Sequence, residues 1–194
     1  MAITYQIGNK LYLNLTNRCS NDCEFCVRRN SEGVAGYKLW LDEEPDYQEV
    51  IDQIGDPSRY KEIIFVGFGE PLYKLELVKK VARWLKERDA IVRVDTNGHA
   101  NLIHGRNVVP ELEGLIDNIS ISLNAATAEK YDQLCHSVYG KKAYDAMLNF
   151  AKEAKKYIPK VILSIVAYDD VDIEKAGQIA EELGVEFRVR EYQD

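Results

Sequence analysis

The chain has 194 residues, of which 46% are hydrophobic and 29% charged, and its net charge is −7. This length is enough for one compact core, and the composition is typical of a globular protein, not a disordered one. The acidic balance argues against non-specific binding to nucleic acid or to a membrane surface, because such binding needs a basic field. No apolar run is long enough to cross a bilayer, and residues 1–6 lack the pattern of a secretory signal. We therefore expect a cytoplasmic protein that forms a single domain over residues 1–194.

Short strands and longer amphipathic helices alternate along the chain. A hairpin opens it, with residues 3–7 and 10–16 on either side of the two-residue turn signal Gly8-Asn9. A helix over 45–54 leads to a strand over 62–68, whose continuous apolar run is typical of a buried parallel sheet. Pro71 suits the first turn of the next helix. The remaining predicted helices span 72–88, 128–134, 143–157 and 172–183, and the remaining predicted strands span 91–96, 118–124, 161–167 and 185–190.

Strand–helix alternation repeated about six times predicts an α/β fold with a parallel sheet and right-handed crossovers. Eight such units would close a full barrel. Six units predict a partial (β/α)6 TIM-like barrel that stays open. In either form, ligands bind at the carboxyl ends of the strands, and the unusual residue clusters of this sequence follow those ends.

The first such cluster is a loop of three cysteines after the strand over 10–16. Cys19, Cys23 and Cys26 have the spacing Cys-x3-Cys-x2-Cys. Three thiolates can ligate three irons of a cubane cluster and leave the fourth iron open to a substrate or cosubstrate. The alternatives are a zinc knuckle that borrows Cys135 as its fourth ligand, or a cluster that only transfers electrons.

This loop, with Phe25 directly before its third cysteine, resembles the signature of the radical S-adenosylmethionine superfamily. The resemblance implies a 4Fe–4S cluster on Cys19, Cys23 and Cys26, whose open iron binds the methionine part of S-adenosylmethionine. It implies that one electron from a reductant of the flavodoxin or ferredoxin type cleaves this cofactor reductively. The products are methionine and a 5′-deoxyadenosyl radical, which abstracts a hydrogen atom from the substrate. In the family, the aromatic residue that matches Phe25 packs near the adenine.

The strand over 62–68 is followed by a segment that resembles the family's Gly-Gly-Glu-Pro motif. The resemblance implies that the backbone of Phe68 and Gly69 and the carboxylate of Glu70 meet the cofactor's amino group. Such a role suits these residue types, because a glycine allows close approach and a carboxylate favours an ammonium group. Phe68 departs from the pattern, since it occupies the first glycine position.

Three later strands end in further polar or apolar candidates for cofactor contacts. Thr96 and Asn97 resemble the family's Thr-Asn-Gly turn, which implies contacts with the methionine or ribose part. Ser122 and Asn124 stand where the family has Ser-Leu-Asp, which implies hydrogen bonds to ribose hydroxyls. Polar residues on one face of a central strand also indicate a wet cavity or a ligand. The strand over 161–167 lacks the family's Gly-x-Ile-x-Gly motif and offers Ile165 and Val166 for the adenine face instead.

Five residues are candidates for substrate binding. Arg28 directly follows the cysteine loop, and Arg188 and Arg190 share one face of the last strand, so each can bind a carboxylate or phosphate. The alternative for the last two is the solvated side of an edge strand. Cys135 is a candidate hydrogen-atom donor or a buried thiol, and His136 is a candidate acid or base or a surface residue.

The whole sequence is most similar to a small subgroup named for gene linkage to a TatD-type hydrolase, which implies a functional link to such a hydrolase. The stretches that carry this similarity are 16–28, 65–71, 120–125 and 187–192. The sequence thus predicts a radical enzyme that acts on a small-molecule or nucleoside-like substrate. The alternatives are an activase that places a radical on a glycine of a partner protein, and a non-catalytic adaptor that binds an iron–sulfur cluster or zinc.

Overall fold

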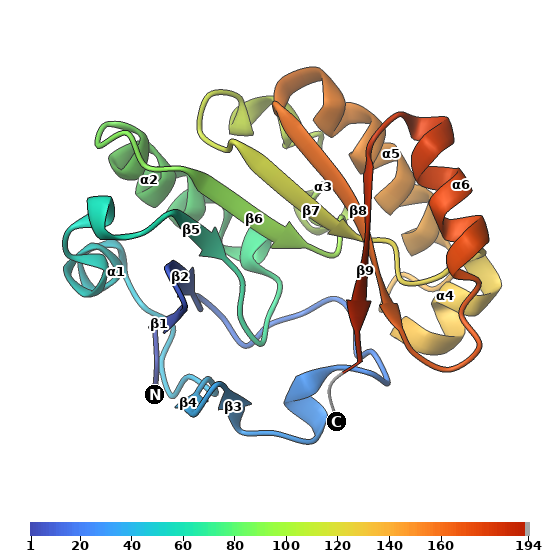
Figure 1. The fold of residues 1–194 in the computed structure, drawn as a ribbon, viewed down its shortest axis with the longest axis horizontal. Coiled ribbons are helices and arrows are strands. Elements are labelled where there is room, and N and C mark those ends of the chain that lie inside the picture. Colours follow the sequence, from blue (N-terminus) through green and yellow to red (C-terminus); the bar gives the residue numbers. More distant parts are fainter. Residues whose placement is uncertain (193–194) are drawn as a thin grey trace.

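Seven strands form one twisted sheet, in the order β1-β2-β5-β6-β7-β8-β9 (Figure 1). The structure, a computed structural model, describes residues 1–192, so the last two residues of the predicted domain lie outside the described residues. The strands of the sheet are β1 (Thr4–Ile7), β2 (Lys10–Leu13), β5 (Glu62–Phe65), β6 (Val92–Thr96), β7 (Asn118–Ser122), β8 (Lys160–Ala167) and β9 (Glu186–Glu191). A separate two-stranded ribbon pairs β3 (Gly33–Val34) with β4 (Tyr37–Lys38).

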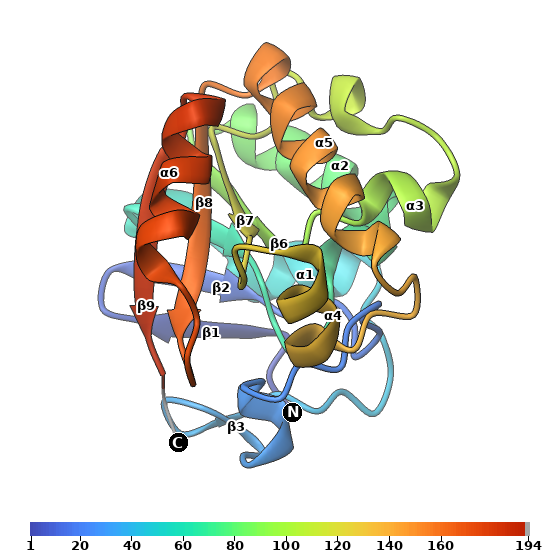
Figure 2. The same cartoon turned by 90° about the vertical axis from the view of Figure 1, so that its right-hand side faces the viewer.

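Helices cover the outer face of the sheet, as the two perpendicular views show (Figures 1 and 2). They are α1 (Tyr47–Ile54), α2 (Leu75–Lys86), α3 (Ala100–His104), α4 (Ala128–Cys135), α5 (Lys142–Tyr157) and α6 (Ile173–Leu183). Four 3₁₀ turns complete the described elements: η1 (Val27–Arg29), η2 (Pro57–Arg59), η3 (Pro71–Lys74) and η4 (Val109–Leu112). Of these helices, none within residues 1–192 is long and apolar enough to span a membrane.

The predicted partial barrel is confirmed. Strands β2 and β5 to β9 run parallel, each beside the next in sequence, whereas β1 pairs antiparallel with β2. In the described part of the chain β1 and β9 remain the two edges of the sheet, so the barrel does not close. The carboxyl ends of the six parallel strands therefore meet at one open end of the molecule.

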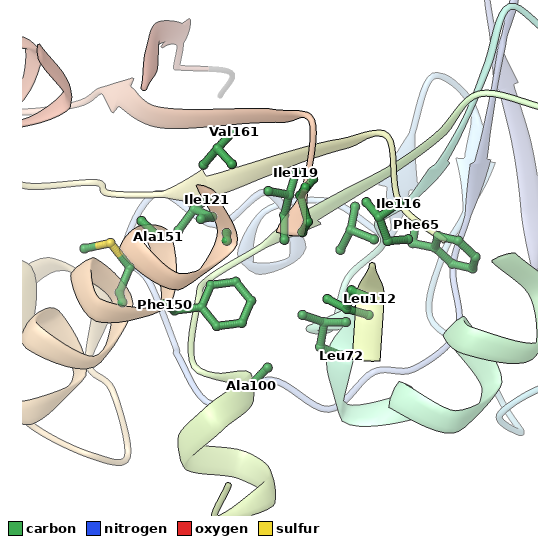
Figure 3. Close-up of a cluster of buried hydrophobic side chains, with 14 of the residues drawn as sticks. Phe65, Leu72, Ala100, Leu112, Ile116, Ile119, Ile121, Phe150, Ala151 and Val161 are labelled. Atoms are coloured by element: carbon green, nitrogen blue, oxygen red, sulfur yellow. The ribbon is translucent and has the colours of Figure 1, made fainter. Parts of the chain in front are cut away.

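The core lies between the sheet and the outer helices (Figure 3). Neighbouring strands are in register, so that Phe65, Val94 and Ile119 form one row of outward side chains. Phe150 and Ala151 of α5 pack on this face, and all five of these side chains are fully buried. This arrangement leaves the opposite face of every strand to line the inside of the half-barrel.

Three predicted strands end earlier than expected. β2, β5 and β7 stop at Leu13, Phe65 and Ser122, because the backbone leaves the ladder there. Asn14 replaces the lost pairing: its Nδ2 donates to the carbonyls of Ala2 (3.2 Å) and Leu39 (2.7 Å), and its Oδ1 accepts from the Phe68 amide (3.3 Å). The residues that were predicted as strand but lie beyond the observed strand ends therefore form the open end of the half-barrel.

The predicted helix over 72–88 begins instead as the 3₁₀ turn η3 and continues as α2. The carboxylate of Glu70 accepts from the Leu72 amide and caps this turn, with Pro71 at its first position. The short elements α3, β3 and β4 were not predicted, because each spans five residues or fewer and carries no periodic pattern.

Candidate functional site

The cysteine loop connects β2 to η1 at the open end of the half-barrel (Figure 1). Two backbone hydrogen bonds of 2.9 Å fix it to the end of α4: the amide of Asp22 donates to the Cys135 carbonyl, and that of Glu24 to the Leu134 carbonyl. The Val138 amide donates to the Ser20 carbonyl, also at 2.9 Å. The loop is therefore held by a segment more than 100 residues later in the chain.

All three predicted thiols of this loop are partly exposed, and all three have a raised pKa. Burial raises the pKa of Cys19 to about 12, with a further contribution from Glu70, and burial also raises that of Cys26. The pKa of Cys23 is raised first by its contact with the Cys135 thiol and then by burial. Free thiols here stay protonated at neutral pH, so the loop is unsuited to nucleophilic catalysis. Bound iron, in contrast, would deprotonate them.

The surroundings of Cys19 fit a ligand of an iron–sulfur cluster. The Asn21 amide (3.5 Å) and Asn97 Nδ2 (3.7 Å) both donate to Cys19 Sγ, and such donors stabilise a cluster-bound thiolate. Within residues 1–192 there is no group of three or more acidic, histidine or cysteine side chains spaced for a single metal ion. Thiolates that each bind a different iron of a cubane need no such convergence on one point.

A buried polar network, which we call the platform, lies beneath this loop and consists of Ser20, Asn21, Asn97, His99 and Tyr131. His99 is fully buried and joins Ser20 Oγ through Nδ1 (3.0 Å) to Tyr131 Oη through Nε2 (3.2 Å). Asn97 Nδ2 donates to Ser20 Oγ (2.9 Å), and Asn21 Nδ2 donates to Tyr131 Oη (3.0 Å). Burial lowers the pKa of His99 to about 4, so its ring is neutral at pH 7. The platform ties the loop to the end of β6 and to α4.

Glu70 is buried in the same region and serves the fold with both carboxylate oxygens. Oε1 accepts from Thr96 Oγ1 (2.8 Å) and from the Leu72 amide (3.0 Å), and Oε2 accepts from the Asn97 amide (2.7 Å). Burial raises the pKa of Glu70 to about 7, against these three donated hydrogen bonds. The carboxylate therefore joins the end of β5 to the turn after β6.

The glycines of this motif make room for the chain itself. A Cβ atom on Gly67 would lie 2.0 Å from Asn14 Oδ1, and one on Gly69 would lie 2.3 Å from the Thr16 carbonyl oxygen. The Glu70 amide also donates to the Arg18 carbonyl at 2.8 Å. The missing side chains thus allow β5 to pack closely against the start of the cysteine loop, which is a structural reason for glycine that the sequence alone did not indicate.

Ser122 and Asn124 face the edge strand β9, where both contact Arg190. Arg190 NH2 lies 3.4 Å from both Ser122 Oγ and Asn124 Oδ1, while Asn124 Nδ2 lies 3.7 Å from the sulfur of Cys135. Asn124 adopts a left-handed φ of 57°, which asparagine tolerates better than most residues. Val166 of β8 is paired with Arg190 in the ladder and is buried.

Aromatic side chains lie at two places on this open end. Phe25 packs against Tyr168, with 5.6 Å between ring centroids, and Tyr168 packs against Tyr192 at 4.9 Å. Phe68 packs edge-on against Trp40 at 5.2 Å. The ring predicted to face adenine is therefore positioned beside the segment that follows β8.

The structure gives three of the predicted substrate residues other surroundings. Arg28 donates to the carbonyl of Asn21 (3.1 Å) and to the carboxylate of Asp22 (3.2 Å), so it holds the cysteine loop. Cys135 is fully buried, and its sulfur contacts Cys23 and Asn124. His136 is exposed at the end of α4 and contacts Glu24 Oε1 at 3.2 Å. The geometry favours a structural position for each of the three.

Asn97 is the one member of the platform among the predicted site residues. Ser20 and Asn21 lie in the predicted cysteine loop without an assigned role, and His99 and Tyr131 were passed over. The available signal was weak: His99 directly follows the Asn-Gly turn, and Tyr131 lies in the helix that ends at Cys135. Nothing in either neighbourhood indicates that the two rings meet. Their contact depends on the packing of α4 against the turn after β6.

A cavity of about 340 Å³ lies at the opposite, amino-terminal end of β8 and β9. Lys160 and Glu186 in its lining already form an ion pair at 2.9 Å. This cavity is far along the strands from the thiols, so the chemistry-bearing residues and the cavity do not coincide.

Comparison with known proteins identifies the class that this fold and site define. The family model described as the radical SAM superfamily matches residues 13–183. The chain belongs to the radical S-adenosylmethionine superfamily, in which a 4Fe–4S cluster acts together with S-adenosylmethionine.

Two curated relatives match about four-fifths of this chain. An uncharacterized protein from Methanocaldococcus jannaschii is 29% identical over 154 residues, which are 79% of this chain and 46% of the relative. A tungsten-containing aldehyde ferredoxin oxidoreductase cofactor-modifying protein from Pyrococcus furiosus is 26% identical over 163 residues, 80% of this chain and 43% of that protein. The chain thus spans less than half the length of these relatives.

Solved structures share the fold. SuiB from Streptococcus suis, bound to its precursor peptide SuiA, superposes with a TM-score of 0.74 at 16% identity over 95% of this chain and 39% of SuiB. A radical SAM methyltransferase from Sphaerobacter thermophilus superposes with a TM-score of 0.60 at 16% identity, over 97% of this chain and 68% of the methyltransferase. Both likenesses establish the shared architecture.

Proposed function

We propose that this chain is a radical enzyme that binds a 4Fe–4S cluster through Cys19, Cys23 and Cys26. The observation that carries the proposal is the position of these thiols, at the carboxyl ends of parallel strands in a chain of the radical S-adenosylmethionine superfamily. When bound, the cluster and S-adenosylmethionine supply a 5′-deoxyadenosyl radical that abstracts hydrogen from a substrate. The electron comes from a separate reductant of the flavodoxin or ferredoxin type.

The proposed cofactor contacts follow the strand ends. Phe25 and Val166 bind the adenine, and Ser122 and Asn124 bind the ribose; the half-buried or buried position of each near the cysteine loop supports these roles. The remaining residues of this proposed site are Phe68, Gly69, Glu70, Thr96 and Asn97. For the last three, the hydrogen bonds among them support a positioning role, in which they fix the turns that face the cofactor.

The substrate is proposed to be a small or nucleoside-like molecule, with the whole chain acting as one domain. Arg188 and Arg190 are its proposed contacts, and Arg28, Cys135 and His136 are weaker candidates given their contacts within the protein. Similarity over 16–28, 65–71, 120–125 and 187–192 supports assignment to the TatD-linked subgroup. A gene neighbour that encodes a TatD-type hydrolase would support that link, and consistent absence of one would contradict it.

The test is anaerobic reconstitution with iron and sulfide, followed by reduction and addition of S-adenosylmethionine. We expect about four irons per chain and formation of 5′-deoxyadenosine, measured by liquid chromatography. Cys23→Ala should lose most of the iron and at least about 100-fold of the product, since it removes a cluster ligand. Cys135→Ala is the matched control, because it removes a thiol from the same place but not a proposed ligand. Cluster-loaded protein that forms no 5′-deoxyadenosine would contradict the proposal and favour an adaptor.

A further inference from the structure

The inner face of the half-barrel carries charged side chains in rows set by the strand register. Arg93 of β6 and Asp95 lie on this face, as do Glu62 of β5 and Glu186 of β9. Arg188 and Arg190 occupy the two rows nearest the carboxyl end of β9, beside Ser164 and Val166 of β8. Arg188 and Arg190 therefore lie at the end of the half-barrel where the cysteine loop lies.

Each inner-face carboxylate already has a basic partner. Lys10 pairs with Glu62 at 2.8 Å, and Lys160 pairs with Glu186 at 2.9 Å. Asp95 pairs with Arg93 through two contacts, of 2.6 Å and 3.1 Å. The inner face is thus neutralised along most of its length, as expected for charges that lie close to a core.

Arg188 and Arg190 are the exception. Within residues 1–192, neither has a carboxylate within ion-pair distance, although Asp95, which is paired with Arg93, is near enough to interact electrostatically with both. The Nε atom of Arg190 is buried without any hydrogen-bond partner, and its NH2 makes only long contacts, of 3.4 Å, with Ser122 and Asn124. Burying a guanidinium group in this state costs free energy unless an anion completes its shell.

Arg190 is close to the cysteine loop. Asn124 contacts both Arg190 and the sulfur of Cys135, and Cys135 in turn contacts Cys23. An anionic group held by the arginines would therefore place the rest of its molecule within reach of the open end, where the cysteine loop lies. A solvated edge strand does not account for the buried, unpartnered Nε atom.

We propose that Arg188 and Arg190 form an oxyanion site that binds a carboxylate or phosphate group of the substrate. This inference rests on the proposed function and names the substrate class for it. Arginine suits the role because its planar donors match both groups in a bidentate geometry. The substrate would then be a small acid or phosphate ester, held on β9 with its reactive carbon toward the cysteine loop.

The test is thermal unfolding of the full chain with inorganic phosphate, and separately with acetate, against chloride at equal ionic strength. We expect at least one of the two anions to raise the midpoint for the wild type, because a ligand that binds the folded state stabilises it. Arg188→Gln and Arg188→Gln/Arg190→Gln should weaken that anion's affinity about tenfold or more. Arg188 is exposed, so its single variant keeps the test valid even if Arg190 variants fold poorly.

Arg59→Gln is the control, because Arg59 is exposed on the turn η2 and should retain the full effect of the anion. An equal midpoint shift in all four proteins, or no shift with either anion, would overturn the site.

Binding of S-adenosylmethionine to cluster-loaded protein distinguishes the source of the anion. If phosphate leaves the affinity for S-adenosylmethionine unchanged, the arginines bind a group of the substrate. If phosphate competes with S-adenosylmethionine, the arginines bind the cofactor's methionine carboxylate, and the proposal is overturned. Failure to form 5′-deoxyadenosine would instead count against the proposed function, whatever the anions do.

Discussion

The platform beneath the cysteine loop and the carboxyl-end half of β9 differ in how their polar groups are satisfied. In the platform, His99 uses both ring nitrogens and Tyr131 Oη contacts two side chains, although Asn21 Oδ1 is buried without a partner in the described chain. On β9, Arg190 keeps a buried Nε without a partner, and Arg188 has no carboxylate within ion-pair distance in the described chain. The first region is organised to hold a loop, and the second is left open toward a ligand.

This difference has a thermodynamic counterpart. A buried hydrogen-bond network stabilises the fold, because breaking any member leaves other groups unpaired in a dry interior. An incompletely paired buried charge contributes little or even destabilises, and its removal in favour of an apolar side chain is often tolerated. We therefore expect substitutions in the platform to lower mainly the free energy of unfolding. Substitutions of Arg188 and Arg190 should weaken mainly ligand binding.

Replacing His99 by leucine should have the largest effect on stability. We expect the free energy of unfolding to fall by about 2 to 4 kcal/mol, since Ser20 Oγ and Tyr131 Oη both lose a partner. Urea unfolding followed by circular dichroism measures this loss. His136→Asn is the control, because this histidine is exposed and asparagine tolerates its φ of 44°. Equal losses in the two variants would remove the distinction.

Acid should destabilise the wild type through the same residue. The unfolded chain protonates His99 near pH 6.5, whereas burial lowers its pKa in the folded state to about 4. Between these values the unfolded state binds more protons, so stability falls as the pH falls. The difference corresponds to about 3 kcal/mol, at about 1.4 kcal/mol for each pH unit. His99→Leu should lack this dependence, and parallel pH profiles of the two proteins would contradict it.

Removing only the hydroxyl of Tyr131 should have an intermediate effect. We expect Tyr131→Phe to lower the free energy of unfolding by about 1 to 2 kcal/mol, because His99 and Asn21 each lose a contact while the ring stays in place. Tyr144→Phe is a matched control, since the Tyr144 hydroxyl has no hydrogen-bond partner among residues 1–192. An equal or larger loss in the control would show that the hydrogen bonds of the Tyr131 hydroxyl add nothing specific to stability.

Arg190→Met should change stability least. The expected change in the free energy of unfolding is within about 1 kcal/mol, because an incompletely paired guanidinium is replaced by an apolar chain of similar length. The same variant should lose the stabilisation by phosphate or acetate. A loss of more than about 2 kcal/mol in urea unfolding would place Arg190 in a stabilising network like the platform.

The sequence was sufficient for the fold class and for placing the cysteine loop at the open end of the sheet. Alternation of strand and helix patterns predicted the open parallel barrel, because local hydrophobic periodicity determines which elements form. The spacing of Cys19, Cys23 and Cys26 predicted that their thiols lie in one loop, since three cysteines within eight residues need no tertiary structure to lie together. Each strand-end motif could be assigned to the open end because the carboxyl ends of parallel strands meet there.

Only the tertiary structure decided what surrounds these residues. Along the chain, His99 lies 79 residues after Ser20 and 32 residues before Tyr131. No local pattern therefore indicates that the three share one network. Arg28 appeared free in the sequence, yet the fold turns its donors back onto the cysteine loop. For Arg190 the sequence left two interpretations open, solvent or ligand. The fold leaves this residue half-buried, with a buried and unpaired Nε, on the side of β9 that faces β7 across the half-barrel. Side-chain partners of this kind depend on which strands the sheet brings together, and periodicity along the chain does not encode them.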